Sequence, residues 1–224
     1  MRSFDAIYDQ TLNLKGGKIQ TESKLPKPSS KRKLKTISDD RFLSEMTKCI
    51  FRAGFIWRVI EAKWDDFEKA FYGFDPEKMV LLSDEQLEKY TDDKRIVRNF
   101  QKIKTVRHNA GLILKIQKSH GSFSEFIADW PCSDLVGLFE LLKKDGQRLG
   151  GNTSQYLFRF MGKDTYIFST DVITALHRER VIDKIKVPTS KRDKHAIQAA
   201  FNQWHDDSNR PYCQISRILA MSVG

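Results

Sequence analysis

The sequence predicts an all-α protein, and three observations support this prediction. From Ile37 to the C-terminus, apolar residues recur at the spacing of helices that bury one face. Residues that cap helices, chiefly Ser and Asp, stand before most of these segments. Only Thr165–Phe168 has the composition of a strand, and this segment is too short to build a sheet. No internal repeat is visible.

The helices are predicted from their start signals and apolar periods. Ser38-Asp39-Asp40 offers an N-cap, and Asp75-Pro76 and Ser83-Asp84 place Pro or acidic residues in a first turn. Ile96 to Lys118 is a long amphipathic stretch. The remaining segments are short and follow Ser, Asp or turn residues; we expect helices over 122–130, 133–144, 154–161, 172–178, 190–204 and 212–223.

Composition limits the class of protein. The chain has 224 residues, 40% of them hydrophobic, which excludes a wholly disordered chain. No apolar run approaches the roughly 20 residues of a membrane span, and the N-terminus has no apolar signal segment. Three cysteines that are far apart, Cys49, Cys132 and Cys213, form no disulfide framework and indicate a cytoplasmic protein. Lys and Arg (39) exceed Asp and Glu (29) by 10, which makes a polyanion the first candidate partner.

The N-terminal region carries much of the basic excess. Between Lys15 and Lys35 there are eight basic residues and one acidic residue, Glu22, without a clear helical or strand period. We expect this stretch from Lys15 to Lys35 to be irregular and solvated, as part of a basic N-terminal arm, residues 1–36, that packs on the body; residues 37–224 are expected to form the helical domain. The arm is either a solubilising linker or a phosphate contact.

A glycine-containing turn between two predicted helices is a candidate DNA contact. Helix-ending Lys143 and Lys144 are followed by Gly150-Gly151-Asn152-Thr153 and then by a helix from Ser154, with the hairpin motif spanning about 135–162. Glycines leave backbone N–H groups accessible, and a helix N-terminus attracts anions. The predicted DNA-binding residues are Arg148, Gly150, Gly151, Asn152, Thr153, Ser154 and, from the earlier long helix, Lys102. The alternative is an ordinary glycine C-cap between packed helices.

The order of elements after this hairpin resembles the helix-hairpin-helix DNA glycosylases. An apolar connector, Tyr166-Ile167-Phe168, leads to Ser169-Thr170-Asp171 at the next helix. The resemblance implies that Asp171 is the catalytic carboxylate, whereas the residues alone also fit a helix cap. The position of the lysine nucleophile of bifunctional members falls on Ser154 or Gln155, which implies a monofunctional enzyme without lyase activity.

A second set of motifs resembles the 3-methyladenine-DNA glycosylase I family. It comprises Phe51-Arg52-Ala53-Gly54-Phe55-Ile56-Trp57, Phe67, Phe71, Phe74-Asp75-Pro76, Ile96-Val97-Arg98-Asn99, Lys102-Ile103 and Asn109-Ala110. The resemblance implies a base pocket with Trp57, and we add Phe55 as a candidate. Without the resemblance, Trp57, Phe55, Phe67 and Phe71 would be assigned to the core.

This sequence departs from the family at two places. Members of the family usually hold a zinc ion between a Cys and a His near the N-terminus and a His and a Cys near the C-terminus. In this sequence no Cys or His precedes Cys49, and His177, His205 and Cys213 have no recognisable ligand spacing, so we expect no zinc. Cys49 stands where the family has a pocket glutamate, and Glu45, one helical turn earlier, is a candidate substitute. Cys49 and Glu45 therefore complete the predicted base pocket.

The resemblance implies a helical fold with a cleft between two lobes and a monomeric, cytoplasmic DNA glycosylase of base-excision repair. Its expected substrate is double-stranded DNA containing alkylated bases, 3-methyladenine first, and it needs no cofactor. The alternatives are a non-catalytic helix-hairpin-helix DNA-binding protein and, on charge alone, an RNA-binding module.

Overall fold

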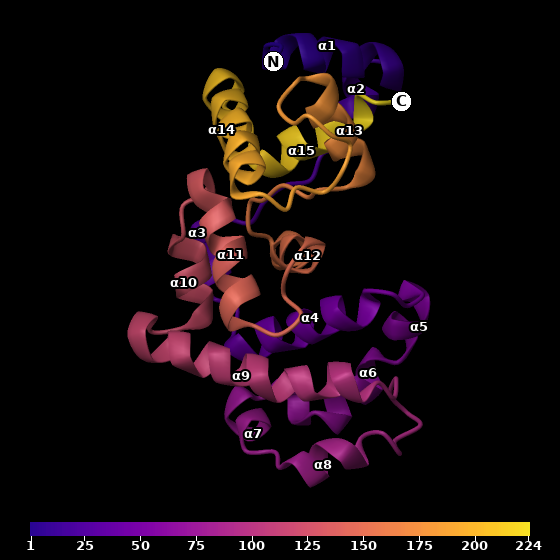
Figure 1. The fold of residues 1–224 in the computed structure, drawn as a ribbon, viewed down its shortest axis with the longest axis vertical. Helices are drawn as coiled ribbons and strands as arrows, with labels where there is room; N and C mark the ends of the chain where they lie inside the picture. Colours follow the sequence, from indigo (N-terminus) through magenta and orange to yellow (C-terminus); the bar gives the residue numbers. More distant parts are fainter. The chain divides into compact units, whose positions relative to one another are not determined.

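The computed structural model describes residues 1–224 and confirms the all-α prediction, because it contains helices and no strand. Figure 1 shows the arrangement of the helices. In chain order they are α1 (Phe4–Lys15), α2 (Lys18–Glu22), α3 (Lys31–Lys35), α4 (Asp39–Arg52), α5 (Trp57–Ala62), α6 (Trp64–Ala70), η1 (Tyr72–Phe74), α7 (Pro76–Val80), α8 (Asp84–Lys89), α9 (Phe100–His120), α10 (Phe123–Asp129), η2 (Cys132–Asp134), α11 (Leu135–Asp145), α12 (Asn152–Met161), α13 (Thr170–Arg178), α14 (Lys191–Ser208) and α15 (Tyr212–Met221).

The chain forms two compact units, and each is built from separate stretches of sequence. The central unit contains residues 30–130 and 139–161, and the terminal unit contains residues 1–29, 131–138 and 162–224. The chain thus passes from one unit to the other after Ser29 rather than at residue 36. No helix is both long enough and apolar enough to cross a membrane.

The central unit is organised around α4, which packs against both α9 and α12. Beneath α4 lies a row of stacked rings from α6 and η1. Ring centroids are 4.9 Å apart for Trp64 and Phe67, 6.0 Å for Phe67 and Phe71, and 5.4 Å for Phe71 and Phe74. Trp64, Phe67 and Phe71 are three or four positions apart, which places them on one face of α6 and of the residue that ends it. Phe74 follows through Tyr72 and Gly73, which have positive φ, so its place in the row comes from this turn. The core assignment of Phe67 and Phe71 is therefore confirmed, since both are fully buried.

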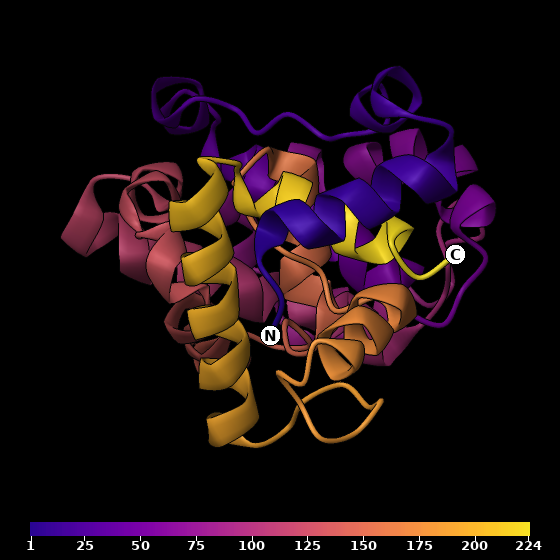
Figure 2. The same cartoon turned by 90° about the horizontal axis from the view of Figure 1, so that it is seen from above.

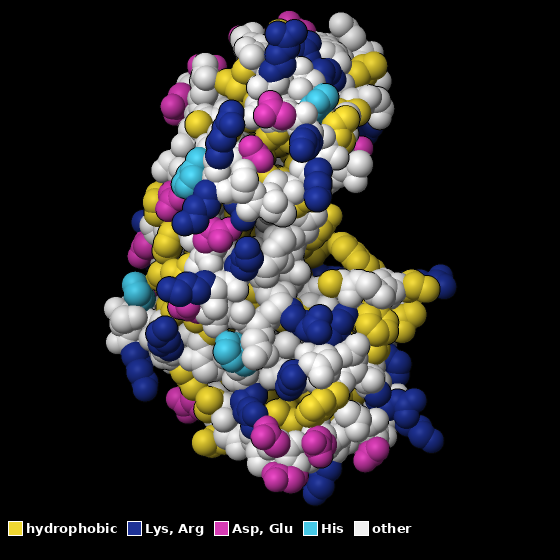
Figure 3. Space-filling model, viewed as in Figure 1, with side chains coloured by type: hydrophobic (Ala, Val, Ile, Leu, Met, Phe, Trp, Pro, Cys, Tyr) yellow, Lys and Arg dark blue, Asp and Glu magenta, His cyan; other side chains and the backbone are white.

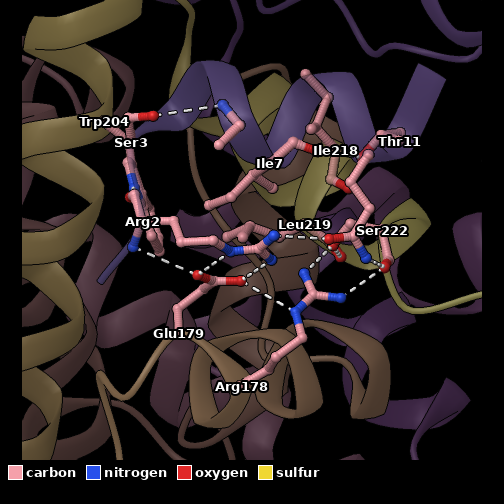
Figure 4. Close-up of polar contacts among 12 residues, drawn as sticks. Arg2, Ser3, Ile7, Thr11, Arg178, Glu179, Trp204, Ile218, Leu219 and Ser222 are labelled. Carbon is pink, nitrogen blue, oxygen red and sulfur yellow. Dashed lines mark hydrogen bonds and ion pairs between the residues drawn. The ribbon is translucent and has the colours of Figure 1, made fainter. Parts of the chain in front are cut away.

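The terminal unit is held together by contacts between the two ends of the chain. Helix α1 packs against α15, as Figure 2 shows. Helix α13 also packs against α15. Figure 4 shows a polar network below α1, in which the Arg2 guanidinium donates to the buried Glu179 carboxylate at 2.6 and 3.0 Å. Arg178 donates to the same carboxylate and to the Ser222 carbonyl, at 3.0 and 2.6 Å.

The expectation of an irregular stretch from Lys15 to Lys35 is wrong where α2 and α3 form, and α1 precedes them. Ser3 and Ser30 cap α1 and α3, and Gly16 and Gly17, both at positive φ, separate α1 from α2. The period of α1 is weak in the sequence because one of its buried positions is the polar Thr11. That residue is satisfied by donating to the Ile7 and Ile218 carbonyls.

Most predicted helix starts are confirmed. Asp75, Ser83, Ser122 and Ser190 each accept a hydrogen bond from the first turn of the helix that follows. The long helix predicted from Ile96 begins instead at Phe100, because the Asn99 side chain accepts from the Lys102 N–H and caps it. The sequence analysis did not predict the short helices α5 and α6.

Candidate functional site

The central unit contains a cavity of about 180 Å³ that is lined by the end of α4, the start of α5 and one face of α12. Its lining residues are Cys49, Arg52, Ala53, Trp57, Asn152, Thr153, Tyr156 and Phe160. The pocket thus brings together two predicted pocket residues, Cys49 and Trp57, and two predicted DNA-binding residues of the hairpin, Asn152 and Thr153. Figure 1 shows why: α12 lies beside α4, although about a hundred residues separate them.

Aromatic rings form one wall of this pocket. Trp57 meets Tyr156 and Phe160 edge to face, with centroids 5.6 and 6.2 Å apart. Tyr156 and Phe160 are four residues apart on α12, so they share a face and stack at 5.8 Å. Trp57 is 45% exposed, so it lines an accessible pocket and is not a core residue. Tyr156 and Phe160 were not among the predicted pocket residues, because their spacing in the sequence indicates only that they share one face of a helix.

Arg52 contributes the charge of the pocket. Its guanidinium carbon lies 5.3 Å from the Trp57 ring centroid and 4.7 Å from that of Phe160. The guanidinium also donates to Glu45 at 2.8 Å and to Glu61 at 2.9 Å. Lys48 pairs with the other Glu61 oxygen at 2.7 Å, so two cations and two carboxylates balance each other here.

Cys49 and Glu45 lie next to this charged group. Cys49 is buried, and its Sγ lies 3.6 Å from a Glu45 oxygen. Burial, reinforced by the Glu45 carboxylate, raises the pKa of the Cys49 thiol, so the thiol is neutral at physiological pH. Glu45 does not line the cavity; its carboxylate is bound to Arg52 instead. Glu45 therefore acts on the pocket through Arg52.

Lys102 lies under the loop that joins α4 to α5. Its ammonium donates to the Ala53 and Phe51 carbonyls at 2.6 and 3.2 Å and lies 4.4 Å from the Phe55 ring centroid. Burial lowers the pKa of Lys102 to about 8, and the charge of Arg148 adds to this effect. Lys102 is only 6% exposed, so its predicted phosphate contact is not supported. Phe55 lies outside the cavity lining.

The hairpin connects α11 to α12 and is anchored from α9. The Asn109 side chain accepts from the Gln147 N–H at 2.8 Å and donates to the Gln147 carbonyl at 3.2 Å. Arg148 and Gly151 have φ values of +58° and +59°, so the chain turns twice through the left-handed region. A Cβ at Gly151 would meet no atom within 4 Å, so its backbone faces open space.

The other predicted hairpin contacts differ in accessibility. Arg148 and Gly151 are exposed, and Gly150, Asn152 and Thr153 are partly exposed. Ser154 is fully buried, because it lies on the inner face of α12, so its predicted DNA contact is not supported. Figure 3 shows that Lys and Arg side chains are spread over the visible face and do not form one basic patch.

Asp171 lies in the first turn of α13, in the terminal unit. Its side chain is exposed and has no hydrogen-bond or ion-pair partner. The N-cap of α13 is Ser169, whose hydroxyl accepts from the Val172 N–H at 3.2 Å. The alternative interpretation of Asp171 as the helix cap is therefore wrong.

The potential metal-ligating side chains of the chain do not form a cluster. Nowhere do three or more His, Cys, Asp or Glu side chains lie close enough to hold a metal ion. The residues present therefore do not fit the zinc site that members of the family usually hold.

Comparison with known protein families matches a region that contains the part of the pocket contributed by α4 and α5, but not the part contributed by α12. Residues 35–140 match a family model described as methyladenine glycosylase. DNA-3-methyladenine glycosylase 1 of Escherichia coli (strain K12) is 28% identical over 125 residues, which are 48% of this chain and 67% of that protein. The resemblance to 3-methyladenine glycosylases noted from the sequence is thereby confirmed.

Solved structures agree on the fold. The chain is similar to 3-methyladenine DNA glycosylase I of Staphylococcus aureus, with a TM-score of 0.51 and 22% identity over 62% of this chain and 80% of that one. It is also similar to an 8-oxoguanine DNA glycosylase of Methanocaldococcus jannaschii, with a TM-score of 0.56 and 15% identity over 94% of this chain and 90% of that one. These likenesses confirm the helical glycosylase fold. The cleft between two lobes stays a prediction.

Proposed function

We propose that this chain is a monofunctional DNA glycosylase that hydrolyses the N-glycosidic bond of alkylated bases. The observation that carries the proposal is the pocket beside the hairpin: aromatic walls from α5 and α12 border the residues that begin α12. A base can be excised from a duplex only after it leaves the stack, which costs a few kcal/mol, and stacking on aromatic rings recovers part of this cost. The likeness to 3-methyladenine glycosylases makes 3-methyladenine the first substrate to test.

In this proposal the hairpin binds the DNA backbone and Asp171 assists bond cleavage. The open backbone at Gly151 and the exposed Arg148 provide an N–H group and a charge for phosphate oxygens. The free Asp171 carboxylate stabilises the positive charge that develops on the sugar and orients water. Neither Ser154 nor Gln155 can act as an amine nucleophile, which is consistent with simple hydrolysis. The proposed enzyme acts as a monomer in the cytoplasm.

The experiment measures release of free base from methylated duplex DNA by the wild-type protein and by Trp57→Ala. Trp57 is part of the pocket wall, so we expect its loss to slow excision roughly 10- to 100-fold, the equivalent of about 1–3 kcal/mol of stacking. Binding to undamaged duplex should change little, because the hairpin is intact.

Trp64→Ala is the matched comparison, since Trp64 is a buried core residue. It should lower the melting temperature, whereas Trp57→Ala should not. Binding to DNA without release of any base would instead support the non-catalytic DNA-binding alternative, and preference for duplex RNA would support the RNA-binding one. Equal losses of excision and undamaged-duplex binding in Trp57→Ala would contradict its pocket role.

A further inference from the structure

Arg52 is the only charged residue in the pocket lining. Its side chain is 12% exposed and lies over the Trp57 and Phe160 rings at 5.3 and 4.7 Å. The other lining residues are neutral, and burial keeps the Cys49 thiol protonated. A base that enters this pocket therefore meets a fixed guanidinium directly, whereas the Glu45 and Glu61 carboxylates that balance its charge lie behind it, outside the cavity lining.

The neighbours of Arg52 hold this charge in place without using all its donors. Nη1 donates to Glu45 at 2.8 Å, and both Nε and Nη2 donate to Glu61, Nε at 2.9 Å. These bonds use three of the five N–H groups of a guanidinium, which leaves one on each terminal nitrogen. Arg52 is thus oriented by its carboxylate partners and lies against the Cys49 sulfur, and the N–H groups that these contacts leave over can donate to a ligand.

We propose that Arg52 is a specificity-determining residue that fits the pocket to neutral alkylated bases. This inference rests on the proposed glycosylase function. A cationic base would meet a like charge, and it would find the Trp57 and Phe160 rings already engaged by a guanidinium. A neutral base instead presents ring nitrogen or carbonyl acceptors to the free N–H groups.

The chemistry of base loss gives Arg52 a second role with neutral bases. When the bond between C1′ and the base nitrogen breaks, its electron pair stays with the base, so a neutral base becomes anionic. A guanidinium beside the base stabilises that developing charge. The oxygen of water then bonds to C1′, and one proton of that water ends on the base nitrogen, which gives free base and an abasic sugar.

A cationic base leaves as a neutral molecule and does not need this donor. For that reason 3-methyladenine, which is a good leaving group, remains a substrate. Arg52 extends the range of substrates to neutral bases, which are poorer leaving groups.

The test uses two duplexes that differ only in the position of one methyl group. Guanine methylated at N7 is cationic in DNA, whereas its isomer methylated at O6 is neutral. Single-turnover release of each base is measured for the wild type and for Arg52→Gln. We expect release of the O6 isomer to fall relative to that of the N7 isomer by about tenfold or more in the Gln variant.

Two further variants separate charge from packing. Arg52→Lys keeps the charge, so its ratio of the two rates should stay closer to the wild-type ratio than that of Arg52→Gln. Glu45→Gln removes a carboxylate partner of Arg52 and should shift the ratio the opposite way, toward the O6 isomer. This variant keeps the proposal testable if Arg52→Gln fails to fold, which thermal melting would show.

The outcomes distinguish this inference from the function on which it rests. Equal changes in the two rates, or a wild type that releases only the cationic base, would overturn the role of Arg52 and leave the glycosylase function intact. Release of neither base nor of 3-methyladenine would overturn the glycosylase function. The role of Arg52 would then be tested by the affinities of the two duplexes. Tighter binding of the O6-methylated duplex than of the N7-methylated one, abolished in Arg52→Gln, would support the role. Equal affinities in the wild type would overturn it.

Discussion

Asp171 is the residue on which catalysis is expected to depend. Its carboxylate is exposed and unpartnered, and Ser169 caps the helix, so Asp171→Asn removes a charge without removing a cap. We expect the variant to melt within a few degrees of the wild type and to bind DNA. Base excision should slow by about 10²–10³, the usual effect of losing a preorganised electrostatic contact. The measurement is single-turnover base release combined with thermal melting.

Ser169→Ala is the matched control, since it removes the cap and keeps the carboxylate. We expect it to lose about 1 kcal/mol of stability and to excise normally once folded. Wild-type excision by Asp171→Asn on every substrate would contradict the catalytic role of Asp171.

At the level of single elements, the hairpin depends on the backbone conformation of Gly151. Its φ of +59° strains a residue with a β-branched side chain, and a side chain there would project toward the expected phosphate. We expect Gly151→Val to weaken DNA binding at least about tenfold while the protein still folds. Gly151→Asn should retain the hairpin conformation, because Asn tolerates positive φ. Fluorescence anisotropy at matched salt measures both, and equal affinities for the wild type and the Val variant would refute the phosphate contact.

The buried ammonium of Lys102, which lies at the end of α4, makes the stability of the protein depend on pH. Its pKa is lowered from 10.5 to about 8 in the folded protein, so between these values the unfolded chain binds more protons. The contribution of Lys102 to the unfolding free energy therefore rises with pH between about 8 and 10.5, by at most about 1.4 kcal/mol per pH unit. Below pH 8 the cost of burying the charge is fully present.

Urea unfolding of the wild type and of Lys102→Met across this range tests the prediction. The stability of the wild type should rise relative to that of the Met variant as the pH increases. A constant difference between them would show that Lys102 keeps its ordinary pKa.

For the whole molecule, Glu179 connects the beginning of the chain to its end. Burial opposes its ionisation, but hydrogen bonds from Arg2 and Arg178 hold the pKa of Glu179 below its ordinary value. Glu179→Gln should lower the unfolding free energy at pH 7 by about 1–3 kcal/mol. Because a lowered carboxyl pKa stabilises the folded state above the unfolded pKa of 4.5, the difference should shrink as the pH falls below 4.5.

Denaturant unfolding at pH 7 and at pH 3.5 measures this difference, with Glu88→Gln, an exposed carboxyl outside the network, as the control. A difference that is the same at both pH values would contradict the ion-pair explanation. The network also means that removing residues 1–35 would disrupt the terminal unit itself. Phosphate contacts of this region are therefore better tested by single charge reversals.

The sequence by itself determined the helical class and most helix starts, and its resemblance to known glycosylases pointed to two residues of the pocket, Cys49 and Trp57. Caps such as Ser83 and Ser122 act on N–H groups two or three residues away, so they are visible in any short window of sequence. Trp57 and the Gly150-Gly151 turn were found because their motifs are contiguous. The weakly periodic helices of the first 35 residues were not predicted, because they are stabilised mainly by their packing on distant parts of the chain.

Only the tertiary structure decided which residues share a site. Tyr156 and Phe160 join Trp57 because α12 packs on α4, and Arg52 becomes a pocket residue because its guanidinium lies over the Trp57 and Phe160 rings. Packing on α4 also buries Lys102 of α9 and Ser154 of α12, which are polar in the sequence and therefore appeared suited to bind DNA. Periodicity shows that a helix has a buried face but not what that face meets, because the partner comes from a remote part of the chain.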